Sequence, residues 1–158
     1  MRAIKSLKLT IPLTVFMAAV FLLLFAFTQS SYAISRSGNC GDNMSWELDD
    51  DGLLTISGSG EMDDYSTYGK VPWNTYKSKI KMVVISDGVT SIGDYAFYQC
   101  VNMKEIAIPD SMTRIGDRAF GTCRNLGNLV IPGKVTSIGD SCFYDCDGLT
   151  NVAIPGSV

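Results

Sequence analysis

The stretch VTSIGDYAFYQC, from Val89 to Cys100, returns almost unchanged as VTSIGDSCFYDC from Val135 to Cys146. A third version, MTRIGDRAFGTC, begins at Met112, so that successive copies are 23 residues apart. A fixed period of this length indicates a repeat in which one copy cannot bury its apolar side alone and must stack on the next. The stretch therefore predicts a solenoid, and its recurring residue types are assigned to packing before any chemistry.

Three full copies occupy residues 83–105, 106–128 and 129–151, and the first part of a fourth occupies 152–158. Each copy begins with alternating residues such as EIAIP, in which isoleucines face one side and Glu and Ala the other. This alternation predicts a short strand with one buried face, and the proline ends it. Successive strands are expected to pair in a parallel sheet.

A Gly-Asp pair opens the second half of each copy, at 93–94, 116–117 and 139–140. Glycine permits a turn with positive φ, and the aspartate is suited to N-cap a short helix. Phe97 and its equivalents are then expected to point into the core. The predicted fold class is an α/β-type repeat solenoid of 23-residue coils, with parallel strands and short helices.

The first 33 residues have the layout of an export signal. Arg2, Lys5 and Lys8 precede an uncharged apolar run, and Ser31 and Ala33 have the small side chains of a signal-peptidase site. We expect cleavage after Ala33. An uncleaved membrane anchor is the alternative, because the apolar run is about nineteen residues long. In both cases the rest of the chain lies outside the cytoplasm.

Composition excludes several classes of function. The chain has thirteen Lys and Arg, three of them in the signal, and sixteen Asp and Glu. The remaining chain therefore has ten basic and sixteen acidic residues, a net charge of −6. Nucleic acid and anionic membrane surfaces are therefore poor partners. The chain has no histidine, which removes Ser-His and Cys-His nucleophile pairs and histidine-ligated zinc. We expect no enzyme, no catalytic residue, no metal site and no cofactor.

Cysteine recurs at one repeat position, as Cys100, Cys123 and Cys146, and Cys142 replaces an alanine of the other copies. Stacked coils lie about 4.8 Å apart, which is close enough for a disulfide. However, three in-register cysteines cannot pair off evenly, and a thiol packs as a small apolar group. The pattern favours a ladder of buried thiols over bridges, and Cys40 has no assignable partner.

Residues 34–82 are predicted to form an N-terminal capping region for the repeats at 83–158. Two strand-like stretches, MSWEL and LLTIS, flank the turn-forming sequence Asp-Asp-Asp-Gly at 49–52, which predicts a β-hairpin. Pro72 then opens a short helical pattern with Trp73 on its inner face. A hairpin and a helix in this place would cover the first coil.

The repeats resemble the BspA-like leucine-rich repeats of bacterial surface proteins. The pattern I-x-I-P-x-x-V-T-x-I-G-x-x-A-F-x-x-C-x-x-L covers residues 83–158, with departures at 86–87, at 127–128 and at Cys142. The stretch CGDNMSWELDDDGLLTISGSGEM is similar to the segment that often precedes such repeats. The resemblance implies a leucine-rich-repeat-like fold and a secreted or wall-attached, non-catalytic binding protein of the adhesin type. It names no ligand.

Acidic residues are the candidates for a metal site. Asp94, Asp117 and Asp140 recur at a spacing of about 5 Å, and calcium prefers oxygen ligands. Helix N-caps account for the same residues, and the calcium-binding nonapeptide of β-rolls is missing. The acidic runs at 49–51 and 63–64 lack EF-hand spacing and fit turns. A carboxylate pair for glycoside hydrolysis would need a cleft that a short solenoid does not offer.

The outer face of the long sheet is the predicted binding site. The first file of side chains, called the polar file, consists of Met82, Glu105, Asn128 and Asn151. The second, called the apolar file, lies beside it and consists of Val84, Ala107, Val130 and Ala153. This flat surface suits a protein or a glycan, although strands favour such residues anyway and the face can be idle. Tyr98 and Tyr144 form a rival patch on the helical side. The predicted ligand-binding residues are Val84, Glu105, Ala107, Asn128, Val130, Asn151 and Ala153.

These inferences predict a secreted or cell-surface protein that binds an extracellular protein or glycan, as in adhesion or host interaction, without catalysis. Contact with a membrane is expected only through an uncleaved N-terminal segment. The alternative is a structural spacer or a fragment of a larger surface protein, because the chain stops within a coil at Val158. An accessory role in glycan-acting enzyme chemistry is the third reading.

Overall fold

A computed structural model describes residues 36–158, so the predicted signal segment at 1–33 lies outside the described residues. Short strands dominate, and the described helices are two short 3₁₀ turns, η1 (Tyr68–Lys70) and η2 (Asn74–Tyr76). The strands are β1 (Arg36–Gly41), β2 (Met44–Leu48), β3 (Leu53–Gly58), β4 (Gly60–Glu61), β5 (Met82–Ile85), β6 (Val89–Ile92), β7 (Glu105–Ala107), β8 (Arg114–Ile115), β9 (Asn128–Val130), β10 (Ser137–Ile138) and β11 (Asn151–Ala153).

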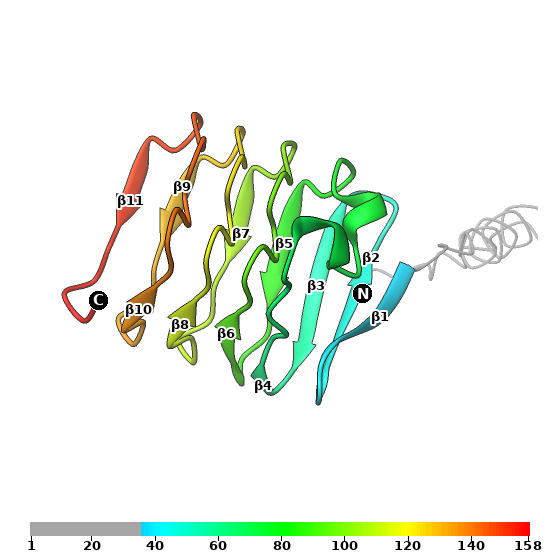
Figure 1. Ribbon diagram of the computed structural model, residues 1–158, viewed down its shortest axis with the longest axis horizontal. Helices are drawn as coiled ribbons and strands as arrows, with labels where there is room; N and C mark the ends of the chain where they lie inside the picture. Colours follow the sequence, from blue (N-terminus) through cyan, green and yellow to red (C-terminus); the bar gives the residue numbers. More distant parts are fainter. Residues whose placement is uncertain (1–35) are drawn as a thin grey trace, which may run out of the picture. The chain divides into compact units, whose positions relative to one another are not determined.

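The strands form two layers (Figure 1). One layer has the order β1-β2-β3-β5-β7, followed by a separate pair of strands, β9 and β11. The other layer has the order β10-β8-β6-β4. Pairing is parallel except at β1-β2 and β2-β3, and from β5 onward it joins residues 23 apart, such as Met82 with Glu105 and Asn128 with Asn151. The 23-residue period of the sequence is therefore the register of the sheets.

The first strands show how the chain enters the repeats. MSWEL and LLTIS pair as the antiparallel strands β2 and β3, as predicted. Asp49 closes the turn between them, because its Oδ1 atom accepts the backbone N–H groups of Gly52 and Leu53, both at 2.8 Å. β3 then pairs in parallel with β5, in the same sense as the strands of the repeats. The helix expected after Pro72 is only the single turn η2.

The short helices predicted after each Gly-Asp pair are wrong. Tight turns take their place, with left-handed residues such as Tyr95 (φ 58°) and Gln99 (φ 61°). These turns direct hydrogen bonds along the stack: Phe97 N–H donates to the carbonyl of Ala119 at 2.8 Å, and Gln99 N–H to that of Gly121 at 2.8 Å. In an α-helix the same N–H groups would donate to carbonyls within the helix itself. Bonds between copies replace bonds within a helix.

A stack of aromatic rings runs through the core. The rings of Phe97 and Phe120 are 5.6 Å apart, and those of Phe120 and Phe143 are 5.7 Å apart. Trp73 extends the stack ahead of the repeats, 5.8 Å from Phe97, and its Nε1–H donates to the carbonyl of Ala96 at 2.9 Å. The segment before the repeats thus supplies the ring that a further copy would supply.

The aspartates of the Gly-Asp pairs bind the next copy rather than a helix of their own, which corrects the predicted N-cap. Asp94 Oδ1 accepts the backbone N–H of Asp117 at 2.8 Å, and Asp117 Oδ1 accepts that of Asp140 at 2.7 Å. A Cβ atom on Gly116 would clash with Asp94 Oδ1. Glycine is required here by this close approach and not by a positive φ.

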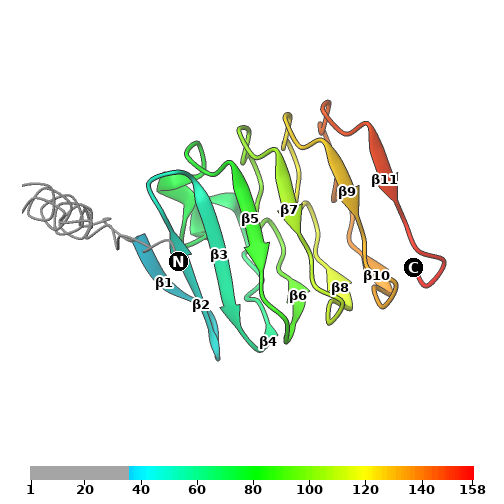
Figure 2. The ribbon, with the colours of Figure 1, turned by 180° about the vertical axis from the view of Figure 1, so that it is seen from behind.

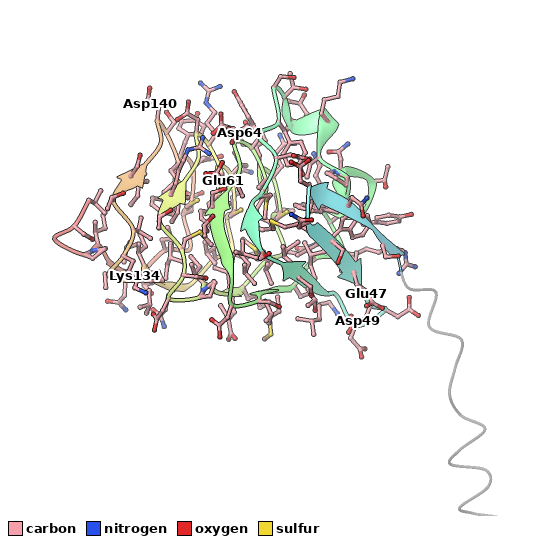
Figure 3. The ribbon with its side chains drawn as sticks, turned by 90° about the horizontal axis from the view of Figure 1, so that it is seen from below. Glu47, Asp49, Glu61, Asp64, Lys134 and Asp140 are labelled. Carbon is pink, nitrogen blue, oxygen red and sulfur yellow. The ribbon has the colours of Figure 1, made fainter. Side chains whose placement is uncertain are left out.

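Asp64 starts this ladder before the first repeat. Its Oδ1 atom accepts the backbone N–H of Asp94 at 2.9 Å, and Arg114 bridges Asp64 at 3.0 Å and Asp94 at 2.9 Å. Figure 3 shows Asp64 and Asp140 along the same edge of the fold. Partial burial raises the pKa of Asp64, but the hydrogen bonds from Arg114 and Asp94 outweigh it and hold the pKa below its usual value of 3.8.

All five cysteines are free thiols, in line with the favoured prediction. The Cys123 thiol donates to the carbonyl of Phe97 at 3.1 Å, and the Cys146 thiol donates to that of Phe120 at 3.0 Å. Burial raises the pKa of Cys100 to about 12, and it raises the pKa of Cys146 as well. The thiols are therefore packing groups, and those of Cys123 and Cys146 also donate a hydrogen bond to the previous copy.

The ring stack predicts unequal costs for two equivalent phenylalanines. Phe120→Ala removes a fully buried ring with neighbours on both faces and should lower the free energy of unfolding by about 3–5 kcal/mol. Phe143→Ala removes a half-buried ring and should cost clearly less. Urea unfolding measures both, with the exposed Tyr144→Ala as control, expected within about 0.5 kcal/mol of the parent. Equal costs at Phe120 and Phe143 would contradict the stack.

The Asp64 contacts predict a pH dependence. The folded-state pKa of Asp64 is lowered, so its contribution to stability is present above pH 3.8 and is lost as the pH falls through the folded-state value. Asp64→Asn removes the charge but keeps an acceptor, and should flatten the fall in stability below about pH 4. Denaturant titrations between neutral and acidic pH measure this. Parallel curves for the parent and variant would rule the ion pair out as the cause.

Burial predicts slow thiol chemistry. With a disulfide-forming thiol reagent at about pH 8, the folded chain should react first at half-buried Cys146, while Cys100, Cys123 and Cys142 react only after unfolding. Peptide mapping of the labelled chain identifies the order. A parent chain whose intact mass shows the loss of hydrogens expected for a disulfide would instead support bridges.

Candidate functional site

The predicted outer face is visible in Figure 2, where β5, β7, β9 and β11 lie side by side. Of the predicted ligand-binding residues, Val84 is half-buried and the others are exposed. Val130, at 71 %, is the most exposed large apolar side chain of the described residues, and Met82 is 41 % exposed. Register pairs Val84 with Ala107 and Val130 with Ala153. The structure therefore arranges the polar and the apolar file as predicted, within each pair of strands.

The face is divided between β7 and β9, which the sequence did not predict. Among the strands of residues 36–158, β7 is the last of the five-stranded sheet and β9 pairs only with β11, although the Gly127 N–H just before β9 donates to the Lys104 carbonyl at 3.1 Å. A hollow of about 360 Å³ lies at this division, lined by Lys104, Glu105, Ile106, Gly127 and Asn128. Two of the predicted residues, Glu105 and Asn128, thus line one hollow, from opposite sides of the division.

Lys104, Ile106 and Gly127 were missed as site residues. The available signal was Gly127, which stands where the preceding copies have Lys81 and Lys104. A change of residue type at this position does not disturb the repeat pattern, because the position does not belong to the buried face. Its effect on the surface emerges only when the neighbouring strand is placed beside it.

Asn128 is held in one orientation by the following strand. Its Oδ1 atom accepts hydrogen bonds from Asn151 Nδ2 at 3.1 Å and from Thr150 Oγ1 at 3.2 Å. Both bonds use the carbonyl side of the Asn128 amide, so that its NH₂ group is available to a ligand. The predicted polar file therefore contains a fixed donor next to the hollow.

The inward face of the long sheet is exposed at its last strand, β11. Val152 and Ile154 fall in the buried phase of the repeat, yet they are 38 % and 58 % exposed. β11 is the outermost strand of its sheet among residues 36–158, so these side chains have a described strand on one side only. The equivalent Leu129 and Ile131, one copy earlier, are buried.

The rival tyrosine patch does not form as expected. The Tyr98 ring contacts Tyr68 at 5.4 Å and Tyr95 at 5.7 Å, and Lys77 Nζ lies 5.0 Å from the centre of the Tyr68 ring. Tyr98 and Tyr95 are thus half-buried members of one aromatic cluster, in which Tyr68 is 49 % exposed. Tyr144 stands apart from this cluster and is 62 % exposed. The two predicted tyrosines do not form a joint surface.

The acidic candidates are scattered. A hollow of about 470 Å³ at the β1-β2 turn is lined in part by Asp42, Glu61, Asp63 and Asp64. Within residues 36–158, however, no three acidic or cysteine side chains come together in an arrangement that could hold a metal ion. No helix in the same range is long and apolar enough to cross a membrane.

Several solved structures are similar to the chain. A leucine-rich repeat protein from Eubacterium ventriosum is 31 % identical with a TM-score of 0.63, over 78 % of this chain and 39 % of its own. One from Bacteroides ovatus is 20 % identical, with a TM-score of 0.45 over 73 % and 40 % of the two chains. A leucine rich cell surface protein from Faecalibacterium prausnitzii is 24 % identical, with a TM-score of 0.41 over 82 % and 45 %.

The chain therefore spans about two fifths of the length of the Eubacterium ventriosum protein. No curated protein sequence is significantly similar to it. The model of the BspA type leucine rich repeat region matches residues 74–158, which is more than half of the chain. These residues contain all the stacked copies described above and the turn η2 before them. The chain belongs to the BspA type leucine rich repeat family.

Proposed function

We propose that this is a secreted or cell-surface protein that binds an extracellular protein or glycan through the outer face of the long sheet, without catalysis. The observation that carries the proposal is the exposure of Val130, at 71 %, on a face whose neighbouring positions Ala107 and Ala153 are small. A side chain exposed to this extent does not stabilise the core of the protein. It can stabilise a complex when a binding partner covers it.

Export rests on the N-terminal sequence. The basic start, the apolar run and the small residues before Ile34 support a cleaved signal, and an uncleaved anchor is the other arrangement. Both place the repeats outside the cytoplasm, where an exposed binding face has access to extracellular ligands.

The stacked copies are proposed to form a solenoid whose first coil is covered by residues 36–82. Two observations support this role. The β1-β2 pair adds antiparallel strands at the end of the sheet, beyond β3. Trp73 and Asp64 also occupy the first places in the aromatic stack and the aspartate ladder. A terminal unit of this kind satisfies the groups that the first copy would leave unpaired.

The face predicts a specific loss of binding. Val130→Lys and Ala107→Glu place charges on the outer face without touching the core, and each should weaken attachment to extracellular-matrix proteins or glycans by about tenfold or more. A plate-binding assay against a panel of both kinds of ligand measures this. Urea unfolding should show stability within about 0.5 kcal/mol of the parent.

Tyr144→Lys is the matched control, because it also replaces an exposed apolar residue with lysine, on the turn side. It should leave attachment unchanged. Attachment that survives Val130→Lys but is lost in Tyr144→Lys would move the site to the turn side. A folded parent chain that attaches to nothing on the panel would favour the structural spacer.

A further inference from the structure

We propose that the hollow between β7 and β9 is a subsite for one neutral sugar unit of a glycan. The inference rests on the proposed binding function and gives it a ligand class and a defined position. The hollow has a volume of about 360 Å³ and is lined by Lys104, Glu105, Ile106, Gly127 and Asn128. Small-molecule sites in proteins begin at about 300 Å³, so the space is suited to a small unit rather than to an extended chain.

Ile106 is the one large apolar residue in the lining of the hollow. Ile106 is only half-buried, whereas its repeat equivalents Val83 and Leu129 are 0 % and 1 % exposed. β7 and β9 do not pair with each other in the described sheets. The side chain at this position is thus buried in the copies on both sides of Ile106, and apart from Ile106 it is exposed only at Val152, on the outermost described strand β11.

Gly127 opens the hollow, and nothing in the backbone requires glycine there. It is not among the described residues with a positive φ, and the nearest atom to an added Cβ would be the Lys104 carbonyl oxygen, at 3.8 Å. The equivalent positions hold Lys81, Lys104 and Thr150. Side chains therefore fit the equivalent position in both other copies and at Lys81 before them, and the absence of one at Gly127 leaves the space free.

The polar groups around the hollow combine donors and acceptors without a net charge. Asn128 is fixed by Asn151 and Thr150 so that its NH₂ group is free to donate. Lys104 supplies an ammonium group and Glu105 a carboxylate, from adjacent positions. Hydroxyl groups both donate and accept, so a sugar ring can use all three groups while its C–H face covers Ile106. A flat protein surface would leave these groups partly unpaired.

The test compares two substitutions at Gly127. Gly127→Lys introduces the residue found at the two preceding equivalent positions, Lys81 and Lys104, and fills the hollow. Gly127→Ala adds one methyl group in open space. The purified full chain is screened against an array of neutral oligosaccharides, and titration calorimetry with the strongest of them gives the affinities. Gly127→Lys should lose about tenfold or more in affinity, while Gly127→Ala should remain within about threefold. Both variants should unfold at the denaturant concentration of the parent or above.

The outcomes separate this inference from the proposed function. If no oligosaccharide binds, but attachment to a matrix protein persists and depends on Val130, the subsite is overturned and the proposed function stands. Equal affinities of the Lys and Ala variants for the oligosaccharide would also overturn the subsite. Competition by a free amino acid, whose two charges match Lys104 and Glu105, would assign the hollow to a zwitterion and contradict the sugar.

Discussion

Hydrogen bonding from one copy to the next, at a spacing of 23 residues, is the constraint on which the rest of this structure depends. Backbone groups pair across copies in both sheets and in the turns, and side chains add further bonds in the same direction. The Asp94 carboxylate binds the Asp117 amide, and the Cys123 thiol binds the Phe97 carbonyl. An unpaired buried polar group destabilises the fold, so the residue type at each of these positions depends on the hydrogen-bonding group that faces it in the neighbouring copy.

This constraint also determines where function can reside. The inward positions are taken by apolar packing and the turn positions by bonds between copies, so chemistry-bearing side chains such as Asp94 and Cys123 are already engaged. Apart from the bond between Asn128 and Asn151, the outward positions of the long sheet have no such role, and their residues vary between copies, for example from Glu105 to Asn128. Residues on a surface that the fold does not constrain can change to suit a ligand without loss of stability.

The sequence predicted the parts that follow from periodicity. The spacing of the copies predicted the register, the alternation in EIAIP predicted that Glu105 and Ala107 point outward, and the Asp-Gly turn predicted the β2-β3 pair. It failed where nonlocal bonds decide. D-x-A-F-x-x-C has the spacing of a helical turn, but the acceptor for Phe97 N–H lies in the next copy, at Ala119. The hollow at Gly127 was missed for the same reason, because a missing side chain matters only beside a neighbouring strand.

Ligand binding at the outer face can be mapped by NMR, with the side-chain amide signals of Asn128 and Asn151 as the main probes. We expect these two signals, and the backbone signals of β7 and β9, to shift together and saturably during titration. Shifts confined to the turn side, around Tyr95 to Gln99 and Ser141 to Asp145, with the two asparagines unaffected, would contradict binding at this face.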